Sequence, residues 1–269
     1  MNGDIPRIGL GTYGRWGDAG RTAILRGLEL GYRHLDTAQS YENEAEVGEA
    51  IRASGVPRDD IFVTTKVADT RLARADFLAS VEESLERLRL DRVDLLLVHW
   101  PSAGDRVPLE DYIGALAEAQ SRGWTRFIGV SNFTIGLLER VDQLLGPGAL
   151  ATNQVEIHPY LQVPRMRDHA RARGLLLTAY QPLAKGTIGI DPIIRRIAEA
   201  HDVAPATISL AFLLAEGHAV IPASSQEGHL RDNLRAGDIR LTAAQIDEIR
   251  ALDRGERRIN PEKSPRWDD

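Results

Sequence analysis

The chain of 269 residues contains no cysteine. This absence excludes disulfides, iron–sulfur clusters and thiolate zinc sites, and it removes any thiol nucleophile. No basic stripe is present either, because the formal charge of −6 is spread over many mixed runs. We therefore expect neither nucleic acid nor an anionic membrane as a partner. No apolar stretch approaches the roughly 18–20 residues that a membrane span requires.

The amino terminus also lacks a feature: residues 1–10 have neither the basic leader nor the apolar core of a signal peptide. We therefore expect a cytoplasmic protein. No low-complexity linker or break in composition divides the chain. This continuity predicts one domain over residues 1–269, and we expect a monomer.

Short β-rich apolar runs alternate with amphipathic stretches from one end of the chain to the other. Such runs, rich in Val, Ile, Leu and Thr, are typical of parallel strands that are covered on both faces. Strands are expected at residues 5–11, 32–38, 61–67, 93–100, 127–132, 152–157, 175–181 and 219–224.

Helical patterns fill the gaps between these strands. The most periodic segment, residues 76–90, places Phe77, Val81, Leu85 and Leu88 on one face. Other helices are expected at residues 21–31, 43–54, 109–123, 135–146, 166–174, 205–217 and 229–237, with two additional ones at 191–203 and 242–253. The strict β–α alternation predicts an α/β protein with a single (β/α)8 TIM barrel and two additional helices.

A glycine-rich segment offers a different interpretation. Residues 9–14 match the G-x-G-x-x-G pattern of a Rossmann fold, and Asp36 follows at the end of a strand. Pro6 weakens this alternative, because proline suits a central strand poorly. We expect instead that these glycines turn the first strand into its loop.

Polar residues stand at the ends of three successive expected strands. Asp36, Lys66 and His99 each follow an apolar run, and Tyr41 comes five positions after Asp36. The carboxyl ends of barrel strands form one rim, so these side chains are expected to converge at the mouth. Taken singly, each has an ordinary structural explanation, as a cap, a strand-end lysine, a core histidine or a packing aromatic.

Seven motifs resemble, in order, those of the aldo-keto reductase family, in particular its short-loop bacterial members of the diketogluconate-reductase type. They are GLGT, LDTAQSYENE, TTKV, LLVHWP, IGVSNF, NQVEIHPY and IPAS…N, and they cover residues 9–233. The resemblance implies a barrel with a nicotinamide cofactor in its mouth and the reversible reduction of an aldehyde or ketone. It also implies a catalytic tetrad of Asp36, Tyr41, Lys66 and His99.

The reaction makes chemical sense of these residue types. An alkoxide that forms on hydride transfer must be protonated, and Tyr41 is the expected general acid. Lys66 would stabilise the phenolate, while Asp36 keeps that ammonium charged and oriented. His99 would hydrogen-bond the substrate oxygen.

The resemblance also implies the cofactor contacts. Ser131, Asn132 and Gln154 would hydrogen-bond the nicotinamide carboxamide, and Tyr180 would stack beneath the ring. Further cofactor-binding residues implied are Thr12, Tyr13, Asp36, Leu183, Lys185, Ser224, His229, Asp232 and Asn233. Structural alternatives remain, since Ser131 and Asn132 fit the cap of a helix near Thr134 and Tyr180 fits the core.

The segment for the adenosine end departs from the family pattern of I-P-K-S followed by an Arg six residues beyond the Lys. Ala223 takes the Lys position and His229 the Arg position. Arg231 is expected on the opposite helix face, and Glu227 is a candidate acceptor for ribose hydroxyls. Losing two charge-assisted hydrogen bonds of roughly 1.5–3 kcal/mol each lowers NADPH affinity about 10²–10⁴-fold. We therefore expect NADPH and/or NADH, with NADH well accepted.

The substrate is expected to be a small-molecule carbonyl compound. Trp16 and Trp100, together with Tyr41 and His99, are the candidate substrate-binding residues, and Trp267 is a further candidate for the pocket wall. The short tail after Asp253 predicts an open mouth.

Three other functions remain open. A Schiff-base enzyme would use Lys66 as its nucleophile, but it leaves the nicotinamide-type motifs unexplained. A metal hydrolase is disfavoured because no H-x-H pair stands at a strand end, and no metal site is expected. A nicotinamide-binding regulatory subunit with little turnover is the third alternative.

Overall fold

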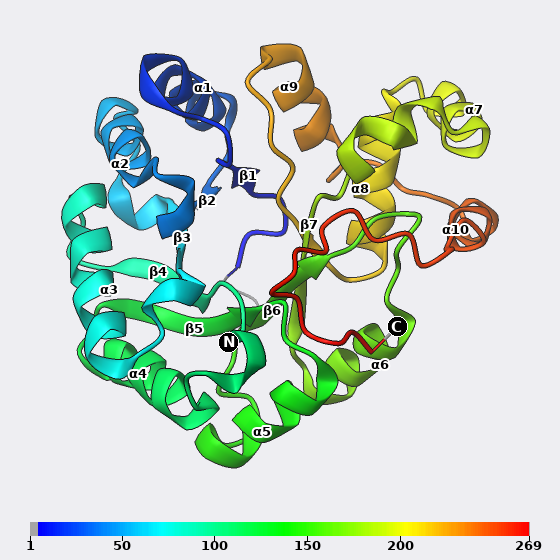
Figure 1. The fold of residues 1–269 in the computed structure, drawn as a ribbon. Helices are drawn as coiled ribbons and strands as arrows, with labels where there is room; N and C mark the ends of the chain where they lie inside the picture. The colour runs from blue at the N-terminus through cyan, green and yellow to red at the C-terminus, as the bar shows by residue number, and fades with distance from the viewer. Residues whose placement is uncertain (1–4, 269) are drawn as a thin grey trace.

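The structure, a computed structural model, describes residues 5–268. Within this range eight parallel strands pair in sequence order, from β1 to β8. A parallel bridge between Ile8 and Val220 joins the two ends of the sheet, which curls into a barrel (Figure 1). The predicted barrel is confirmed. The Rossmann alternative is wrong, because a doubly wound sheet reverses its strand order and this sheet does not.

The first and last strands are much shorter than the sequence predicts. The strands are β1 (Leu10–Gly11), β2 (His34–Asp36), β3 (Phe62–Val67), β4 (Val93–Val98), β5 (Thr125–Ser131), β6 (Thr152–Glu156), β7 (Leu176–Tyr180) and β8 (Ala219–Val220).

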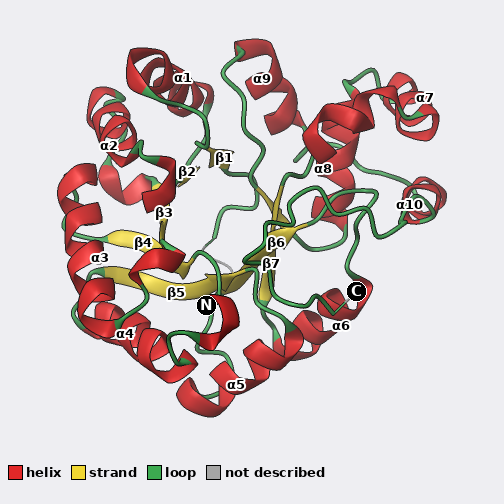
Figure 2. Ribbon diagram, viewed as in Figure 1, coloured by secondary structure: helices red, strands yellow, loops and turns green. Residues whose placement is uncertain are grey.

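The α-helices form a ring outside the strands (Figure 2). They are α1 (Gly17–Leu30), α2 (Glu44–Ala53), α3 (Arg74–Leu88), α4 (Leu109–Ser121), α5 (Ile135–Leu145), α6 (Pro164–Arg173), α7 (Pro192–Ala200), α8 (Pro205–Ala215), α9 (Glu227–Arg235) and α10 (Ala243–Arg250). Short 3-10 helices are η2 (Gln39–Tyr41), η3 (Arg58–Asp60), η4 (Asp69–Arg71), η5 (Ala103–Asp105) and η6 (Ala184–Ile190). The two predicted additional helices are confirmed as α7 and α10.

The helices cover the outer face of the sheet with apolar side chains. In α3 the predicted face is confirmed, because Phe77, Val81, Leu85 and Leu88 are all buried. Burying one such side chain contributes roughly 1.5–3 kcal/mol. This outer core fixes the strands and hence the positions of the side chains that point inward.

Inside the barrel, side chains change from apolar to polar toward the mouth. Phe62, near the amino end of β3, belongs to an apolar cluster with Leu95 and Leu176. Two positions along β3, Thr64 hydrogen-bonds the buried ring of His34. Lys66, two positions further and near the carboxyl end of β3, is on the same inner face, because side chains alternate along a strand with a period of two. The same alternation places Asp36 and Gln154 in the mouth.

Glycines near β1 allow close packing as well as a turn. A Cβ on Gly9 would lie 2.8 Å from a ring nitrogen of His34, and one on Gly11 would lie 2.8 Å from the carbonyl oxygen of Ile221. Gly14, with φ 77°, does turn the loop. The prediction therefore holds for Gly14 in the loop, whereas Gly9 leaves room for the His34 ring and Gly11 for the backbone that follows β8.

Among the described residues, no single helix has the length and apolar composition to cross a membrane. The pair α7 and α8, bent by 91°, meets those criteria only when taken together.

The contact between α2 and α3 generates a stability prediction. Gly→Ala in a helix interior usually stabilises by about 1 kcal/mol. At Gly48 the added Cβ would lie 2.1 Å from the backbone oxygen of Leu88, so the two helices must separate. We expect Gly48→Ala to lower the free energy of unfolding by about 1–3 kcal/mol, measured by urea denaturation.

Gly136→Ala in α5 is the matched control, because nothing lies within 4 Å of its Cβ position. It is expected to leave stability unchanged or to raise it slightly. A stabilised Gly48→Ala variant would show that α2 and α3 are not in contact at this point.

Candidate active site

Four polar side chains from three consecutive strand ends meet at the barrel mouth. The Lys66 ammonium donates to Asp36 Oδ1 at 2.5 Å, to the carbonyl oxygen of Thr37 at 2.9 Å and to the Tyr41 hydroxyl at 3.2 Å. The rings of Tyr41 and His99 are 5.6 Å apart. Asp36 and Lys66 are at most 1% exposed, so water cannot solvate either charge. The structure thus brings together all four residues of the expected tetrad.

The electrostatic environment sets distinct protonation states. Burial lowers the pKa of Lys66, but Asp36 and Tyr41 outweigh it, and the net pKa lies above the usual value. Burial raises the pKa of Tyr41, and the nearby Lys66 ammonium only partly opposes this rise. At neutral pH the site therefore holds a charged ammonium beside a protonated phenol. A charged Lys66 is a poor nucleophile, which disfavours the Schiff-base alternative.

His99 is a neutral member of the group. Burial, reinforced by the positive charges of Lys66 and Lys263, lowers the pKa of His99 well below 6.5. The hydroxyl of Ser40 lies 3.2 Å from its Nδ1 atom. If Ser40 donates in this hydrogen bond, Nε2 carries the proton and can donate into the cavity.

A second network of amides and hydroxyls lies across the mouth, at the ends of β5, β6 and β7. Gln154 Nε2 donates to Asp36 Oδ2 at 2.7 Å, and Asn132 Nδ2 donates to the carbonyl oxygen of His99 at 3.0 Å. The Tyr180 hydroxyl donates to Asn132 Oδ1 at 2.7 Å. Asn132 has φ 64°, a left-handed conformation that is uncommon outside glycine. The two networks join at the Asp36 carboxylate.

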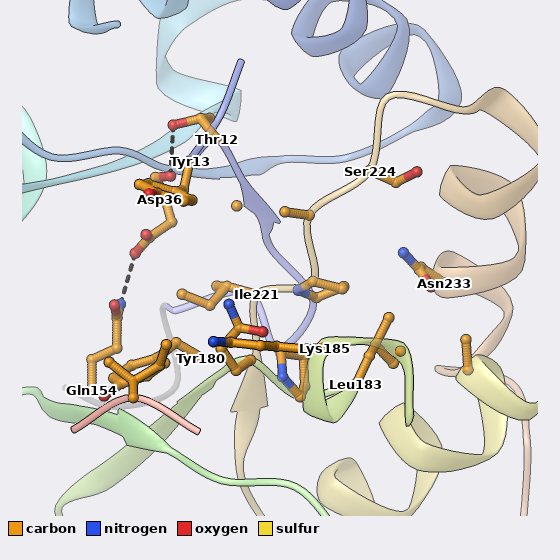
Figure 3. A pocket seen from close by; sticks show the side chains of 18 of the residues that line it. Thr12, Tyr13, Asp36, Gln154, Tyr180, Leu183, Lys185, Ile221, Ser224 and Asn233 are labelled. Atoms are coloured by element: carbon orange, nitrogen blue, oxygen red, sulfur yellow. Dashed lines mark hydrogen bonds between the residues drawn. The ribbon is translucent and has the colours of Figure 1, made fainter. Parts of the chain in front are cut away.

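A cavity of about 970 Å³ opens from this group of side chains. In Figure 3, Gln154 bonded to Asp36 lies on one side of it, and Ser224 and Asn233 lie on the other. Its lining includes most of the predicted cofactor-site and substrate-site residues: Thr12, Tyr13, Asp36, Tyr41, His99, Trp100, Asn132, Gln154, Tyr180, Leu183, Lys185, Ser224, His229, Asp232 and Asn233. The volume is at the upper end of the range of about 300–1,000 Å³ that is usual for ligand pockets.

Several predicted residues do not line this cavity, among them the buried Lys66. The Ser131 hydroxyl donates to the carbonyl oxygen of Gln154 at 2.8 Å and so lies behind the lining. Trp16 is exposed and donates from Nε1 to the backbone oxygen of Tyr41 at 2.6 Å. Trp267 packs edge-on against Trp100 and lines a separate cavity of about 250 Å³. Neither the family resemblance nor residue type distinguished the residues that line the cavity from those that support it.

The helix cap considered as an alternative for Ser131 and Asn132 is provided by another residue. Thr134 is the N-cap of α5, and its hydroxyl accepts from the amide of Leu137. The side chains of Ser131 and Asn132 remain in the network at the mouth.

Known proteins resemble this chain over most of its length. The model of the aldo/keto reductase family matches residues 7–254. The chain belongs to the aldo/keto reductase family. A methylglyoxal reductase, DkgB, from Salmonella typhimurium is 45% identical over 265 residues, which are 98% of this chain and 99% of that protein.

Two further relatives extend the comparison. A 2,5-diketo-D-gluconic acid reductase B from a Corynebacterium species is 38% identical over 248 residues, 92% of this chain and 89% of that protein. The structure of the aldose reductase from Schistosoma japonicum has a TM-score of 0.91 and 32% identity, covering 97% of this chain and 92% of that one. This aldo/keto reductase is therefore an oxidoreductase that acts on carbonyl groups, and nicotinamide nucleotides are the cofactors of the family in general.

At the other end of the cavity, α9 and the loop before it contribute Ser224, His229 and Asn233 to the lining. Glu227 in the first turn of α9 does not line the cavity and forms ion pairs with two arginines. Its Oε1 atom accepts from Arg231 at 2.7 Å, and its Oε2 atom lies 3.4 Å from Arg26 of α1. The role of Glu227 toward ribose hydroxyls stays a prediction, and Arg231 is held by this ion pair.

Sequence reasoning missed residues that support the mouth of this aldo/keto reductase from a distance. Asn43 precedes α2, but its side chain donates to the carbonyl oxygens of Thr12 and Arg15 and accepts from the Thr37 hydroxyl. It thereby fastens the loop after β1 to the segment after β2. The motif LDTAQSYENE includes Asn43 and Ser40, yet only the fold shows which groups their side chains meet.

The buried ion pair generates a second stability prediction. In Asp36→Asn the new amide meets two donors, Lys66 and Gln154, and the Lys66 ammonium loses its counter-charge. Breaking a buried pair in this way is expected to cost about 3 kcal/mol in the free energy of unfolding, measured by urea denaturation. Asp69→Asn is the control, because the 2.5 Å ion pair of Asp69 with Lys263 is partly exposed, and its loss should cost less than about 1 kcal/mol. Equal losses of unfolding free energy in the two variants would argue against burial as the cause of the larger cost at Asp36.

Proposed function

We propose that this protein reduces a small aldehyde or ketone to an alcohol with NADH or NADPH, reversibly, and that Tyr41 is the general acid. The observation that carries the proposal is the contact of a protonated phenol with a buried, charged ammonium at the wall of a large cavity. Such a pair delivers a proton where negative charge develops.

The residues of the cavity fit a nicotinamide nucleotide. Asn132 and Gln154 offer amide groups beside Tyr180, as recognition of a carboxamide on an aromatic ring requires. Lys185 and the beginning of α9 near Ser224 supply positive potential for phosphates farther along. When bound, the nucleotide supplies the hydride that reaches the carbonyl carbon.

The protein's own groups position and protonate the substrate. The carbonyl oxygen accepts from the Tyr41 hydroxyl and from Nε2 of neutral His99, an arrangement that orients the carbon for attack. As negative charge grows on this oxygen, Tyr41 gives up its proton, and Lys66 stabilises the resulting phenolate. Asp36 keeps Lys66 charged throughout. Tyr13, Tyr41 and Trp100 present aromatic surface that limits access of water.

A small carbonyl compound is the substrate class that we propose, including oxidised sugars. The relatives named for methylglyoxal and for 2,5-diketo-D-gluconic acid support this class.

Removing the phenol oxygen of Tyr41 tests its role as the general acid. We expect Tyr41→Phe to lower kcat for carbonyl reduction by about 10²–10⁴-fold, while the Kd of the nicotinamide nucleotide changes little. Absorbance at 340 nm and nucleotide titration measure the two effects. Tyr112→Phe, at a buried tyrosine of α4, is the control with normal turnover. Near-normal turnover of Tyr41→Phe would refute the assignment.

The adenosine end leads us to propose that NADH is well accepted. Ala223 and His229 line the cavity at the positions where the family pattern has Lys and Arg. We expect Ala223→Lys with His229→Arg to raise kcat/KM for NADPH by about 10²-fold or more, because charge-assisted hydrogen bonds to a 2′-phosphate are regained. The kcat/KM for NADH should change little. A hundredfold preference of the natural chain for NADPH would contradict the proposal.

A further inference from the structure

The carboxyl-terminal tail, residues 254–268, is clamped to the barrel mouth by a buried carboxylate. Glu156, the last residue of β6, is fully buried. Its Oε1 atom accepts from the amide of Arg258 at 2.6 Å, and its Oε2 atom accepts from the amide of Ile259 at 2.8 Å. His158 donates to the same carboxylate from Nε2 at 3.0 Å. In Figure 1 the tail, in red, crosses β6 and β7 at this point.

From this clamp the Arg258 side chain reaches the loop after β7. Its Nη2 atom donates to the Thr187 hydroxyl at 3.1 Å. The same Nη2 atom forms an ion pair with Oε1 of Glu256 at 2.6 Å. The Thr187 hydroxyl in turn donates to the carbonyl oxygen of Ala184 at 2.8 Å. A continuous chain of hydrogen bonds therefore runs from the buried Glu156 through the tail into η6.

The η6 loop needs such support because its backbone is strained. Ala184, with φ 46°, and Lys185, with φ 55°, are both left-handed without being glycine. Residues in this conformation persist only where surrounding contacts hold them. Lys185 and Ile188 of this loop and Ile259 of the tail line the same cavity. The contact between Arg258 and Thr187 thus joins two walls of the site.

We propose that Arg258 is a positioning residue that holds the η6 loop over the bound nicotinamide nucleotide and so limits the rate at which the nucleotide leaves. This role rests on the proposed function, because it assumes that the nucleotide occupies the cavity. Arg258 itself does not line the cavity and takes no part in proton transfer. Its effect is transmitted through Thr187.

The release rate of NADH, followed by stopped-flow fluorescence, tests this role. We expect Arg258→Met and Thr187→Val each to raise the release rate by about threefold to tenfold, because each removes the same hydrogen bond. The double variant should release NADH no faster than the faster single variant, since the two changes interrupt one contact. Arg258→Lys should restore slow release in part, whereas a merely structural role would show only in the melting temperature.

Arg266→Met is the matched control, because Arg266 is an exposed arginine of the same tail. It is expected to release NADH at the natural rate. Release rates of Arg258→Met and Thr187→Val that stay within twofold of the natural rate would overturn the role of Arg258, as would effects that multiply in the double variant. If the natural chain binds neither nucleotide, the proposed function itself fails, and that outcome is distinct from unchanged release.

Discussion

The buried ion pair between Asp36 and Lys66 is the constraint on which the site depends. Two charges removed from water persist only when each is paired and fully hydrogen-bonded. Here the ammonium has three acceptors, and the carboxylate accepts from Lys66 and Gln154. β2, β3 and β6 must therefore keep their places around the mouth. The pair is a structural requirement of the barrel as well as the source of the charge beside Tyr41.

One consequence is that neighbouring groups acquire different protonation states without any metal-ligating cluster among the described residues. The pKa of Lys66 is raised, whereas that of His99, a few ångströms beyond Tyr41, is lowered. Burial and the charges of this group account for both shifts, and Lys263 of the tail adds to the lowering at His99. A charged group beside the phenol and a neutral donor at the substrate side suit proton delivery to an alkoxide.

Much of the fold and of the candidate site was predictable from the sequence, because it depends on local patterns of residue types. Alternating apolar runs and amphipathic stretches predict a barrel, and polar residues that end three successive runs predict the contents of its mouth. The lengths of β1 and β8 were not predictable, because they depend on how the ring closes. The supporting positions of Ser131 and Trp16 depend on side-chain direction at the ends of elements. The attachment of the tail to Glu156 was not predictable for another reason: the two donors that the tail supplies are backbone amides, which no residue type marks.

The short bridge at Ile8 and Val220 has a consequence for assembly of the molecule. It joins segments from opposite ends of the chain, so the ring is sealed only after nearly the whole polypeptide has been made, a topology that favours slow folding. Gly11 on one side of this seam and Pro222 on the other both border the large cavity. A ligand in this cavity contacts both sides of the closure. Its binding free energy therefore adds to the free energy that stabilises the closed barrel.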